Sequence, residues 1–461
     1  MRQTLRILTW LICAALPCTC AQRLDIADFG AKCDGGDDSH AVQRALDALH
    51  DGGTLVVSCQ AGIGPKGILL QGKSDITIEG TNGGGFKALA PTPQGVVGFN
   101  SVMFVIRSCV NCVVQGLAID AANVGVVGLG FDQCVSTNVL KNTITNAGPP
   151  PANGAIVAIA NQHNRYVGNA ITHTNGTGPG GDGTRGIWLG NAYERAYEWY
   201  PYVDSNTIQN TAHTGLVLHA VAAEATNNII EGMGDGAGIK TIPAPGKPGI
   251  TRIEHNTVRN GRAVNQGIQL QDAYSDGLII QDNTFAGLAD SGVYGNGGNV
   301  QVIGNTFEDN RTSGITILDG KNWVIRGNTF GADPAAGALP GAGIRLIAAS
   351  GSIENIQIVS NTIGENRYGA VQIRDTGGTV NGVKIEGNAI VRGSSYGVLV
   401  EEGRTNAVNG VEVASNCFAG NGRATLKDNR SADRALGAQP SSASCSSPQT
   451  RQGRLGEGAR K

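Results

Sequence analysis

A short pattern of apolar and variable positions recurs along most of the chain: Gly, an apolar residue, any residue, then a second apolar residue. Such alternation is typical of a half-buried strand, and a Gly before it permits a tight corner. Each copy has a further short apolar segment, as in LIIQD, VQVIG, WVIRG and IQIVS. We therefore predict many strands of about 3 to 5 residues, with no helix between them. The clearest copies begin at Gly186, Gly215, Gly267, Gly314, Gly343 and Gly397.

A second motif, Asn followed by a small and then an apolar residue, interleaves with these strands. Its neighbouring copies are never closer than 22 residues. A repeat of this length, built of short strands, predicts a parallel β-helix whose turns stack at roughly 4.8 Å. We expect each Asn to stand at a left-handed corner and to hydrogen-bond the Asn one turn away. The copies begin at Asn142, Asn169, Asn206, Asn228, Asn256, Asn283, Asn305, Asn328, Asn361, Asn388 and Asn416.

The apolar residue of each Asn motif is predicted to point into a narrow core. In the second half of the chain these residues are Phe285, Phe307, Phe330, Ile363 and Phe418. Before the repeats, apolar residues at helical spacing predict an amphipathic helix from about Ser39 to Leu49. A helix of this kind can cover the open end of a solenoid core.

The segment around this helix also resembles a known family. DFGAKCDGGDDSHAVQRALDA, followed by a GGT strand start at Gly52, is similar to the opening of the pectate-lyase and polygalacturonase superfamily. The matching positions are Phe29, Gly30, Ala31, Asp34, Gly35 and Asp38. The resemblance implies an all-β, right-handed parallel β-helix with a short N-terminal capping helix, and parallel crossovers share that right-handed bias. The superfamily includes hydrolases, lyases, epimerases and phage tailspikes, so the resemblance leaves the chemistry open.

The two ends of the chain differ from the repeats. Residues 1–21 combine two Arg residues, a short apolar run and small residues before the expected cut, which predicts a signal peptide. Residues 22–430 are predicted to form one β-helix domain with its cap in residues 22–60, and residues 431–461 to be disordered. We therefore expect a secreted or periplasmic monomer without a membrane span. Lys plus Arg number 35 against 37 Asp plus Glu, which argues against a nucleic-acid partner.

Cysteine positions predict two disulfides in an oxidising compartment. Cys33 and Cys59 bracket the N-terminal segment and form the first expected pair. Cys109 and Cys134 fall at equivalent positions one turn apart, within the Cα range of a disulfide, and form the second. The CxxC at Cys109 and Cys112 has no second CxxC to complete a zinc site, so we interpret it as packed thiols.

Residues two and four positions after each strand Gly are predicted to point outward in columns. A face of this kind suits an extended polysaccharide, because aromatic rings stack on sugars and polar side chains bind hydroxyls or carboxylates. The alternative interpretation is a face that is merely solvated. The residues assigned to substrate binding are Trp188, Gln269, Gln271, Asn296, Arg345 and Arg374.

Among enzymes, a lyase or epimerase acting on an acidic polysaccharide fits these columns best. Such an enzyme needs a cation that neutralises the uronate carboxylate and a base that removes the neighbouring proton. Lys240 is the predicted base or carboxylate anchor, with His219 and Tyr294 as further catalytic groups on the same face. Asp182 and Asp235 lie in glycine-rich corners and could orient the base or hold a calcium ion, the one cofactor considered.

Two other functions remain open at this point. A glycoside hydrolase needs two carboxylates, and the candidate pairs are Asp272 with Asp319 and Asp375 with Glu402. By strand spacing these pairs lie roughly 9.6 Å and 4.8 Å apart. The paired-Asp, Gly-His-Gly and Arg-x-Lys signatures of polygalacturonases are absent. The third function is a non-catalytic glycan-binding or adhesion solenoid, which needs no catalytic pair.

Overall fold

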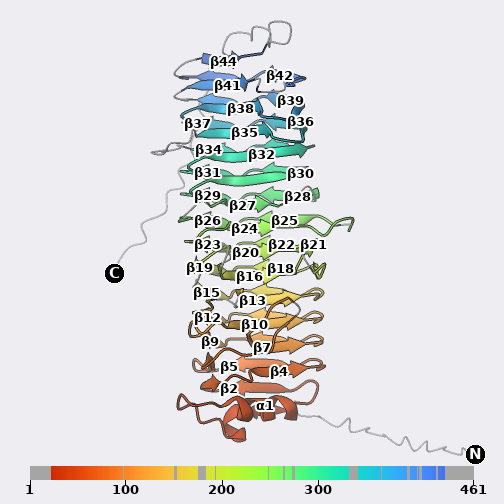
Figure 1. The fold of residues 1–461 in the computed structure, drawn as a ribbon, viewed down its shortest axis with the longest axis vertical. Helices are drawn as coiled ribbons and strands as arrows, with labels where there is room; N and C mark the ends of the chain where they lie inside the picture. Colours follow the sequence, from red (N-terminus) through yellow and green to blue (C-terminus); the bar gives the residue numbers. More distant parts are fainter. Residues whose placement is uncertain are drawn as a thin grey trace, which may run out of the picture.

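The computed structural model describes residues 22–96, 98–149, 153–174, 183–192, 194–247, 249–262, 265–271, 276–331, 341–364, 366–391, 395–401, 403, 407–421 and 424–430. Its strands pair in parallel, turn upon turn, along one long axis (Figure 1). Each turn contributes three short strands, which build three faces of a parallel β-helix. The predicted all-β parallel β-helix is therefore confirmed. The predicted signal peptide and disordered tail lie outside the described residues.

The Gly face contains the strands of the Gly motif. They are β4 (Ile68–Gln71), β7 (Val102–Arg107), β10 (Val127–Asp132), β13 (Gly154–Ile159), β16 (Arg185–Leu189), β20 (Leu216–Leu218), β24 (Ile239–Thr241), β27 (Ile268–Leu270), β30 (Ser291–Ile303), β32 (Ser313–Lys321), β35 (Ala342–Ala348), β38 (Gly369–Asp375), β41 (Tyr396–Glu401) and β44 (Ala424–Asp428).

The pre-Asn face contains the strand that precedes each Asn. Its strands are β1 (Arg23–Asp25), β2 (Thr54–Val57), β5 (Thr77–Gly80), β8 (Val113–Gln115), β11 (Asn138–Leu140), β14 (Arg165–Val167), β18 (Tyr202–Asp204), β22 (Glu224–Thr226), β25 (Thr251–Glu254), β28 (Asp276–Gln281), β33 (Val324–Arg326), β36 (Ser352–Val359), β39 (Thr379–Glu386) and β42 (Val411–Ala414). The long strands β30 and β32 run from the Gly face into this one.

The post-Asn face is a separate 14-stranded sheet. Its strands are β3 (Gln60–Ile63), β6 (Gly85–Ala88), β9 (Ala118–Asp120), β12 (Thr143–Thr145), β15 (Ala170–Thr174), β19 (Thr207–Thr211), β23 (Ile229–Glu231), β26 (Thr257–Arg259), β29 (Thr284–Ala286), β31 (Thr306–Glu308), β34 (Thr329–Phe330), β37 (Thr362–Gly364), β40 (Ala389–Val391) and β43 (Cys417–Ala419). A two-stranded pair, β17 (Glu198–Trp199) and β21 (Ala220–Val221), extends one corner.

The Asn residues form the predicted ladder between the pre-Asn and post-Asn faces. The Oδ1 atom of Asn305 accepts the backbone N–H and the side-chain N–H of Asn283, each at 2.9 Å. The same two bonds link successive copies from Asn142 to Asn416. The prediction that the Asn itself has left-handed backbone angles is wrong. The residue before each Asn has them instead, such as Asp282 with φ 52° or Gly304 with φ 66°. That residue makes the bend, which leaves the Asn amide pointing inward along the axis.

The core column of the second half of the helix is also confirmed. Phe285, Phe307 and Phe330 are buried and stack face to face, with ring centroids 5.2 and 4.8 Å apart. Ile363 and Phe418 continue the buried column. A Cβ atom on Gly292 would lie 2.3 Å from the Phe307 ring, so this position of the Gly motif must be Gly for the ring to fit.

The N-terminal end carries the helix α1 (Ser39–Ala48) and the 3-10 helix η1 (Ile26–Phe29), at the red end of the stack in Figure 1. Val42, Ala45 and Leu46 of α1 belong to the core cluster of the solenoid. No other α-helix occurs in the described residues, and none of their helices is long and apolar enough to cross a membrane.

Cysteines follow the prediction at one pair and depart from it at the other. Cys33 and Cys59 form a disulfide with their Cα atoms 6.1 Å apart. Cys109 and Cys134 are buried free thiols, so the predicted bond between them is wrong. Their sulfur atoms instead hydrogen-bond to backbone carbonyls, Cys109 to Arg107 at 3.4 Å and Cys134 to Ile106 at 3.3 Å.

Candidate functional site

The outward column on the Gly face is continuous. Strand register carries it, one residue per turn, through Trp188, Val217, Lys240, Gln269, Tyr294, Thr316, Arg345, Gln372 and Leu399. This register is the predicted one. The second column is paired from Leu318 through Ile347 and Arg374 to Glu401. Asn296 lies where the register of β30 shifts, between Gly295 and Gly297.

Trp188, predicted as a sugar-stacking platform, is covered by other side chains. It is 9% exposed and belongs to a second apolar cluster outside the main core. The edge-to-face contact with Phe99 brings the two ring centroids within 4.7 Å, and the Arg185 guanidinium lies 4.1 Å from the Trp188 ring centroid. Phe99 comes from the connection between β6 and β7. Since this connection packs on the outward column, the N-terminal half of the Gly face is apolar and closed around Trp188.

His219 lies beside Trp188 and is also buried, with 2% of its surface exposed. Its Nδ1 atom accepts the backbone N–H of Ala192 at 3.0 Å, which places the ring proton on Nε2. Burial, with smaller effects from Lys240 and Arg185, lowers its pKa to about 3. The ring is therefore neutral near pH 7 and has no free lone pair to accept a substrate proton. This geometry fits a hydrogen-bond donor through Nε2 better than a base.

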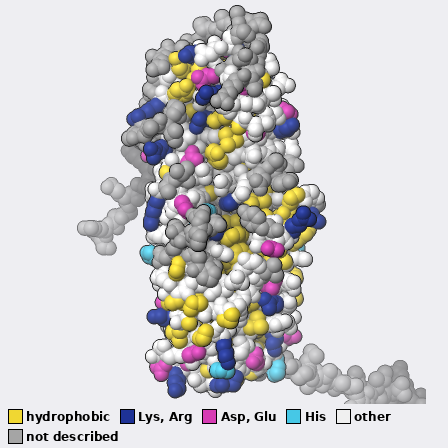
Figure 2. All heavy atoms as spheres, in the orientation of Figure 1, with side chains coloured by type: hydrophobic (Ala, Val, Ile, Leu, Met, Phe, Trp, Pro, Cys, Tyr) yellow, Lys and Arg dark blue, Asp and Glu magenta, His cyan; other side chains and the backbone are white. Residues whose placement is uncertain are grey.

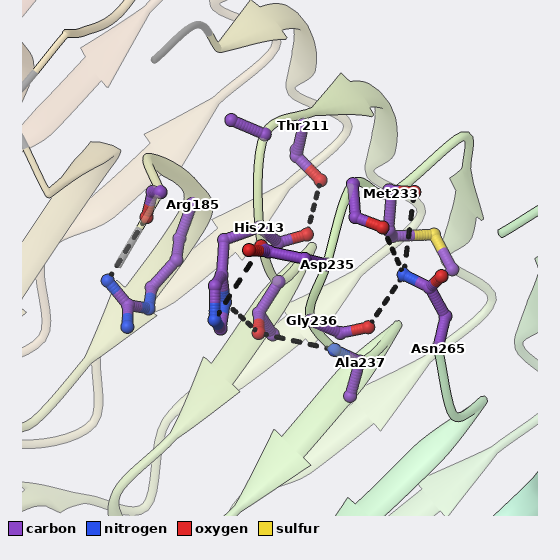
Figure 3. A network of polar contacts seen from close by, with 12 residues as sticks. Arg185, Thr211, His213, Met233, Asp235, Gly236, Ala237 and Asn265 are labelled. Carbon is purple, nitrogen blue, oxygen red and sulfur yellow. Dashed lines mark hydrogen bonds and ion pairs between the residues drawn. The ribbon is translucent and has the colours of Figure 1, made fainter. Parts of the chain in front are cut away.

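Asp235 lies at a corner that borders the Gly face and points toward His213 (Figure 3). The Asp235 Oδ1 and His213 Nε2 atoms are 3.9 Å apart, and His213 Nδ1 lies 2.8 Å from the Thr214 hydroxyl. The Asn265 side-chain amide donates to the carbonyls of Gly234 and Gly236, at 2.7 and 2.8 Å, on either side of Asp235. The carboxylate is thereby held on a fixed loop beside an imidazole. His213, two residues before Gly215, stands outside the columns considered in the sequence, although His before a strand Gly is a usable signal.

Lys240, Gln269 and Tyr294 follow on three successive turns, and all three side chains are half-buried. Asp290 stands at the corner just before β30, the strand that contains Tyr294. Its carboxylate accepts hydrogen bonds from Gln266 Nε2 at 2.6 Å and from the Ser291 hydroxyl at 3.2 Å. Burial raises the pKa of Tyr294, and the Asp290 charge raises it further. The phenol therefore keeps its proton near neutral pH, as a proton donor requires.

Arg345 continues the same column two turns beyond Tyr294. Burial lowers the pKa of its guanidinium, while the Asp290 charge opposes that change. Its Nε donates to Gln372 Oε1 at 3.3 Å, and Gln372 Nε2 donates to Glu401 at 2.9 Å. Arg374, by contrast, is exposed on the next column. The structure thus gathers two Arg residues at this end of the face, where the sequence also placed them.

The predicted hydrolase carboxylates have other surroundings. Asp272 and Glu402 lie outside the described residues. Asp319 sits at a left-handed corner, where its carboxylate accepts the backbone N–H groups of Ala349 and Ser350 at 2.8 and 3.2 Å. Asp375 is fully buried and accepts the N–H of Ala407 at 3.0 Å. Both described carboxylates therefore hold backbone in place.

Neither surface charge nor clustered metal ligands point to a further site on the rest of the described surface. Figure 2 shows Lys and Arg side chains interspersed with Asp and Glu along the face drawn, with no single extended patch of one sign. Within the described ranges, no group of three or more His, Cys, Asp or Glu side chains is arranged to hold a metal ion. Gln271 is half-buried, and Asp182 lies outside the described residues.

Comparison with known proteins identifies the fold. The family described as a right-handed β-helix region matches residues 246–418. No curated protein sequence matches the chain.

Two solved structures are similar over most of the chain. A mannuronic acid-specific family 6 polysaccharide lyase from human gut microbiota aligns with 88% of this chain and 92% of its own, at 14% identity and a TM-score of 0.53. The tailspike protein of E. coli bacteriophage HK620, solved with a pentasaccharide, aligns with 87% of this chain and 79% of its own, at 12% identity and a TM-score of 0.54. At these identities the likeness concerns the fold. The chain therefore has the fold of right-handed parallel β-helix proteins, and the matching family model covers residues 246–418 of it.

Proposed function

We propose that this protein acts on an extended acidic polysaccharide bound along the Gly face, and that it removes the proton next to a uronate carboxylate, as lyases and epimerases do. The observation that carries the proposal is the outward column in which Lys240 and Arg345 flank Tyr294, each two turns away. Four strand spacings span roughly 19 Å, which matches several sugar rings in a row.

The chemistry assigns a different task to each group. A cation that neutralises the uronate carboxylate makes the adjacent proton more acidic, and Arg345 can supply that charge. Lys240, predicted as base or carboxylate anchor, is the base in this proposal and accepts the proton that leaves the sugar. In this proposal Tyr294, which keeps its proton near neutral pH, donates a proton to the leaving oxygen or to the opposite face of the sugar. The fold relatives support this class of substrate, since one is a mannuronic acid-specific lyase and the other was solved with an oligosaccharide.

A glycoside hydrolase remains the second candidate on one specific observation. Asp235 and Asp290 stand at corners two turns apart and one residue out of register, or roughly 9.6 Å apart by strand spacing. An inverting hydrolase uses carboxylates about 6.5 to 9.5 Å apart, so this pair lies just beyond the long end of that range.

Turnover of a panel of polymers tests the proposal. We would incubate the protein with alginate, polygalacturonate and a neutral glucan, and follow both the ultraviolet absorbance of unsaturated ends and the release of reducing ends. Lys240→Ala should abolish turnover of the acidic polymers with an unchanged melting temperature. The matched control is Lys384→Ala, which removes a half-buried Lys paired with Glu386 on the pre-Asn face. Full activity in Lys240→Ala would contradict the assignment, and reducing ends without unsaturation would favour the hydrolase.

Export is a separate proposal, resting on the composition of residues 1–21. Expression of the full chain in a bacterial host should yield a mature protein outside the cytoplasm that begins at Gln22. Recovery of the intact chain from the cytoplasm alone would contradict it.

A further inference from the structure

One column of corners between the Gly face and the pre-Asn face contains an unusual residue. Its members on successive turns all have left-handed backbone angles, and each follows a residue in a ladder of parallel bridges. The column is Asp75 (φ 57°), Asn111 (φ 54°), Ser136 (φ 55°), His163 (φ 55°) and Tyr200 (φ 54°). Asp, Asn and His are enriched at positive φ, whereas a bulky Tyr there is a rare outlier. Such outliers cluster at binding and catalytic sites.

Burial of the Tyr200 side chain does not offset the strain of this backbone angle, because the ring is largely exposed. It is 44% exposed and stacks on the His163 ring, with centroids 4.9 Å apart and planes inclined by 11°. Trp199 lies beside it, with ring centroids 6.2 Å apart. On the next strand, the Arg165 guanidinium covers the Tyr202 ring at 4.5 Å. We call Trp199, Tyr200 and Tyr202, together with His163 and Arg165, the aromatic corner.

A hollow adjoins the aromatic corner on the next turn. It has a volume of about 300 Å³ and is lined by Val221, Ala222, Ala244, Gly249 and Lys247, among others. Trp199 pairs in register with Val221, so the lining of the hollow begins one turn beyond Trp199. The Lys247 ammonium joins the two features, because it lines the hollow and lies 5.5 Å from the Trp199 ring centroid. A hollow of this size is at the lower end of small-ligand sites.

The nearby acidic groups are largely engaged. Asp204 accepts from the Thr226 hydroxyl and the Asn227 amide, at 2.7 and 2.8 Å. Glu198 points into the interior beneath Trp199 and is bonded to Asn161. Glu224 is exposed and lies one turn beyond Tyr202. Its carboxylate is the exposed negative charge, among the described neighbours of the corner named here, that would repel a bound anion. The two cations of the corner, Lys247 and Arg165, lie on its aromatic rings, and the Arg165 charge also acts on the Asp204 carboxylate.

We propose that the aromatic corner and its hollow form a second binding site for a carboxylated glycan, outside the Gly face. The exposed Tyr200 ring offers a flat apolar face to a sugar ring, and Lys247 offers a charge to its carboxylate. The site anchors a neighbouring stretch of a long polymer while the Gly face holds the stretch that reacts. The choice of an acidic glycan rests on the proposed function, whereas the presence of a sugar site does not.

Tyr200→Asn tests the site with little risk to folding, because Asn tolerates the left-handed angle that Tyr200 occupies. The readout is the affinity for alginate and polygalacturonate, measured by affinity electrophoresis in the Lys240→Ala background so that turnover does not consume the polymer. We expect about a threefold to tenfold loss of affinity, since one aromatic contact contributes up to about one decade in binding. The melting temperature should equal or exceed that of the parent, because the backbone strain is relieved.

Two further variants define the ligand. Lys247→Gln should weaken binding of the acidic polymers and leave binding of a neutral glucan unchanged. Val110→Ala is the matched control: Val110 is 40% exposed and stands three turns below Trp199 in the same bridge ladder. This control should bind like the parent.

The outcomes separate this proposal from the proposed function. Parental affinity in Tyr200→Asn and Lys247→Gln, or no polymer binding by the parent, would overturn the second site even if the enzyme is active. Weaker binding in both variants by a protein that turns over no polymer would uphold the second site and contradict the proposed activity. An equal loss of neutral and acidic polymer in Lys247→Gln would overturn the preference for a carboxylated glycan.

Discussion

Removing one side chain from the middle of the Asn ladder is expected to be severely destabilising. Asn305 is fully buried, and its Oδ1 atom accepts two N–H groups of Asn283. Its Nδ2 atom donates to the carbonyl of Ile280 at 2.9 Å and to Oδ1 of Asn328 at 3.0 Å. Asn305→Ala therefore leaves two buried donors of Asn283 and the buried Ile280 carbonyl without these partners, while Asn328 Oδ1 keeps the backbone N–H of residue 305. At about 1 to 3 kcal/mol for each such group, we expect the free energy of unfolding to fall by roughly 5 kcal/mol.

The end of the same ladder supplies the control. Asn416 accepts the same pair of bonds from Asn388 and donates to Ile385, but its side chain is half-buried. Water can replace the lost partners there, so Asn416→Ala should cost only about 1 to 2 kcal/mol. Guanidinium unfolding, followed by circular dichroism, compares the two variants with the parent. A loss in Asn305→Ala that is within about 1 kcal/mol of the Asn416→Ala loss would refute the reasoning that burial of the ladder sets its contribution.

Two other predictions concern the interior. Phe307→Ala removes the middle ring of the stack between Phe285 and Phe330 and should lower the free energy of unfolding by about 3 to 5 kcal/mol in the same assay, whereas an unchanged melt would contradict the stack. Burial raises the pKa of Glu198 to about 7, above its value in the unfolded chain. The group therefore stabilises the folded state at low pH, by roughly 3 kcal/mol. This contribution is lost as the pH rises from about 4.5 through 7. Glu198→Gln should therefore be more stable than the parent at pH 8 and should show less pH dependence between pH 5 and pH 8; parallel pH profiles of the two proteins would contradict this.

Much of the fold could be predicted because the repeat itself carries the information. The Asn interval, the Gly before each strand and the Phe after the Asn each occupy one fixed place in the turn, so counting along the chain also places them in space. The register of the outward column from Trp188 to Leu399 follows from the same counting. Two details differ from what the counting predicts. The left-handed residue precedes the Asn, because the Asn uses its amide for the ladder, and Cys109 and Cys134 are free thiols although they lie one turn apart.

The site was harder to predict because non-periodic segments decide it. Trp188 and His219 do point outward, as counting implies, yet the connection that carries Phe99 covers Trp188, and the N–H of Ala192 occupies the acceptor nitrogen of His219. Neither contact could be predicted from the repeat, because Phe99 and Ala192 lie outside the repeated motifs. His213 and Asp290 each precede the Gly of the strand motif by two residues, at corners where the sequence shows no common residue type. Their closeness to the outward column depends on how each corner folds back onto the face.

Proton NMR of uronate polymers incubated with the protein in deuterium oxide tests the central claim most directly. The account predicts that the signal of the ring proton next to the carboxylate disappears, either because a double bond forms or because solvent deuterium replaces the proton, and that Lys240→Ala prevents this. If that signal persists in full while the polymer binds, or while new reducing ends appear, the protein does not abstract the proton, and the account of the Gly face as a lyase or epimerase site is contradicted.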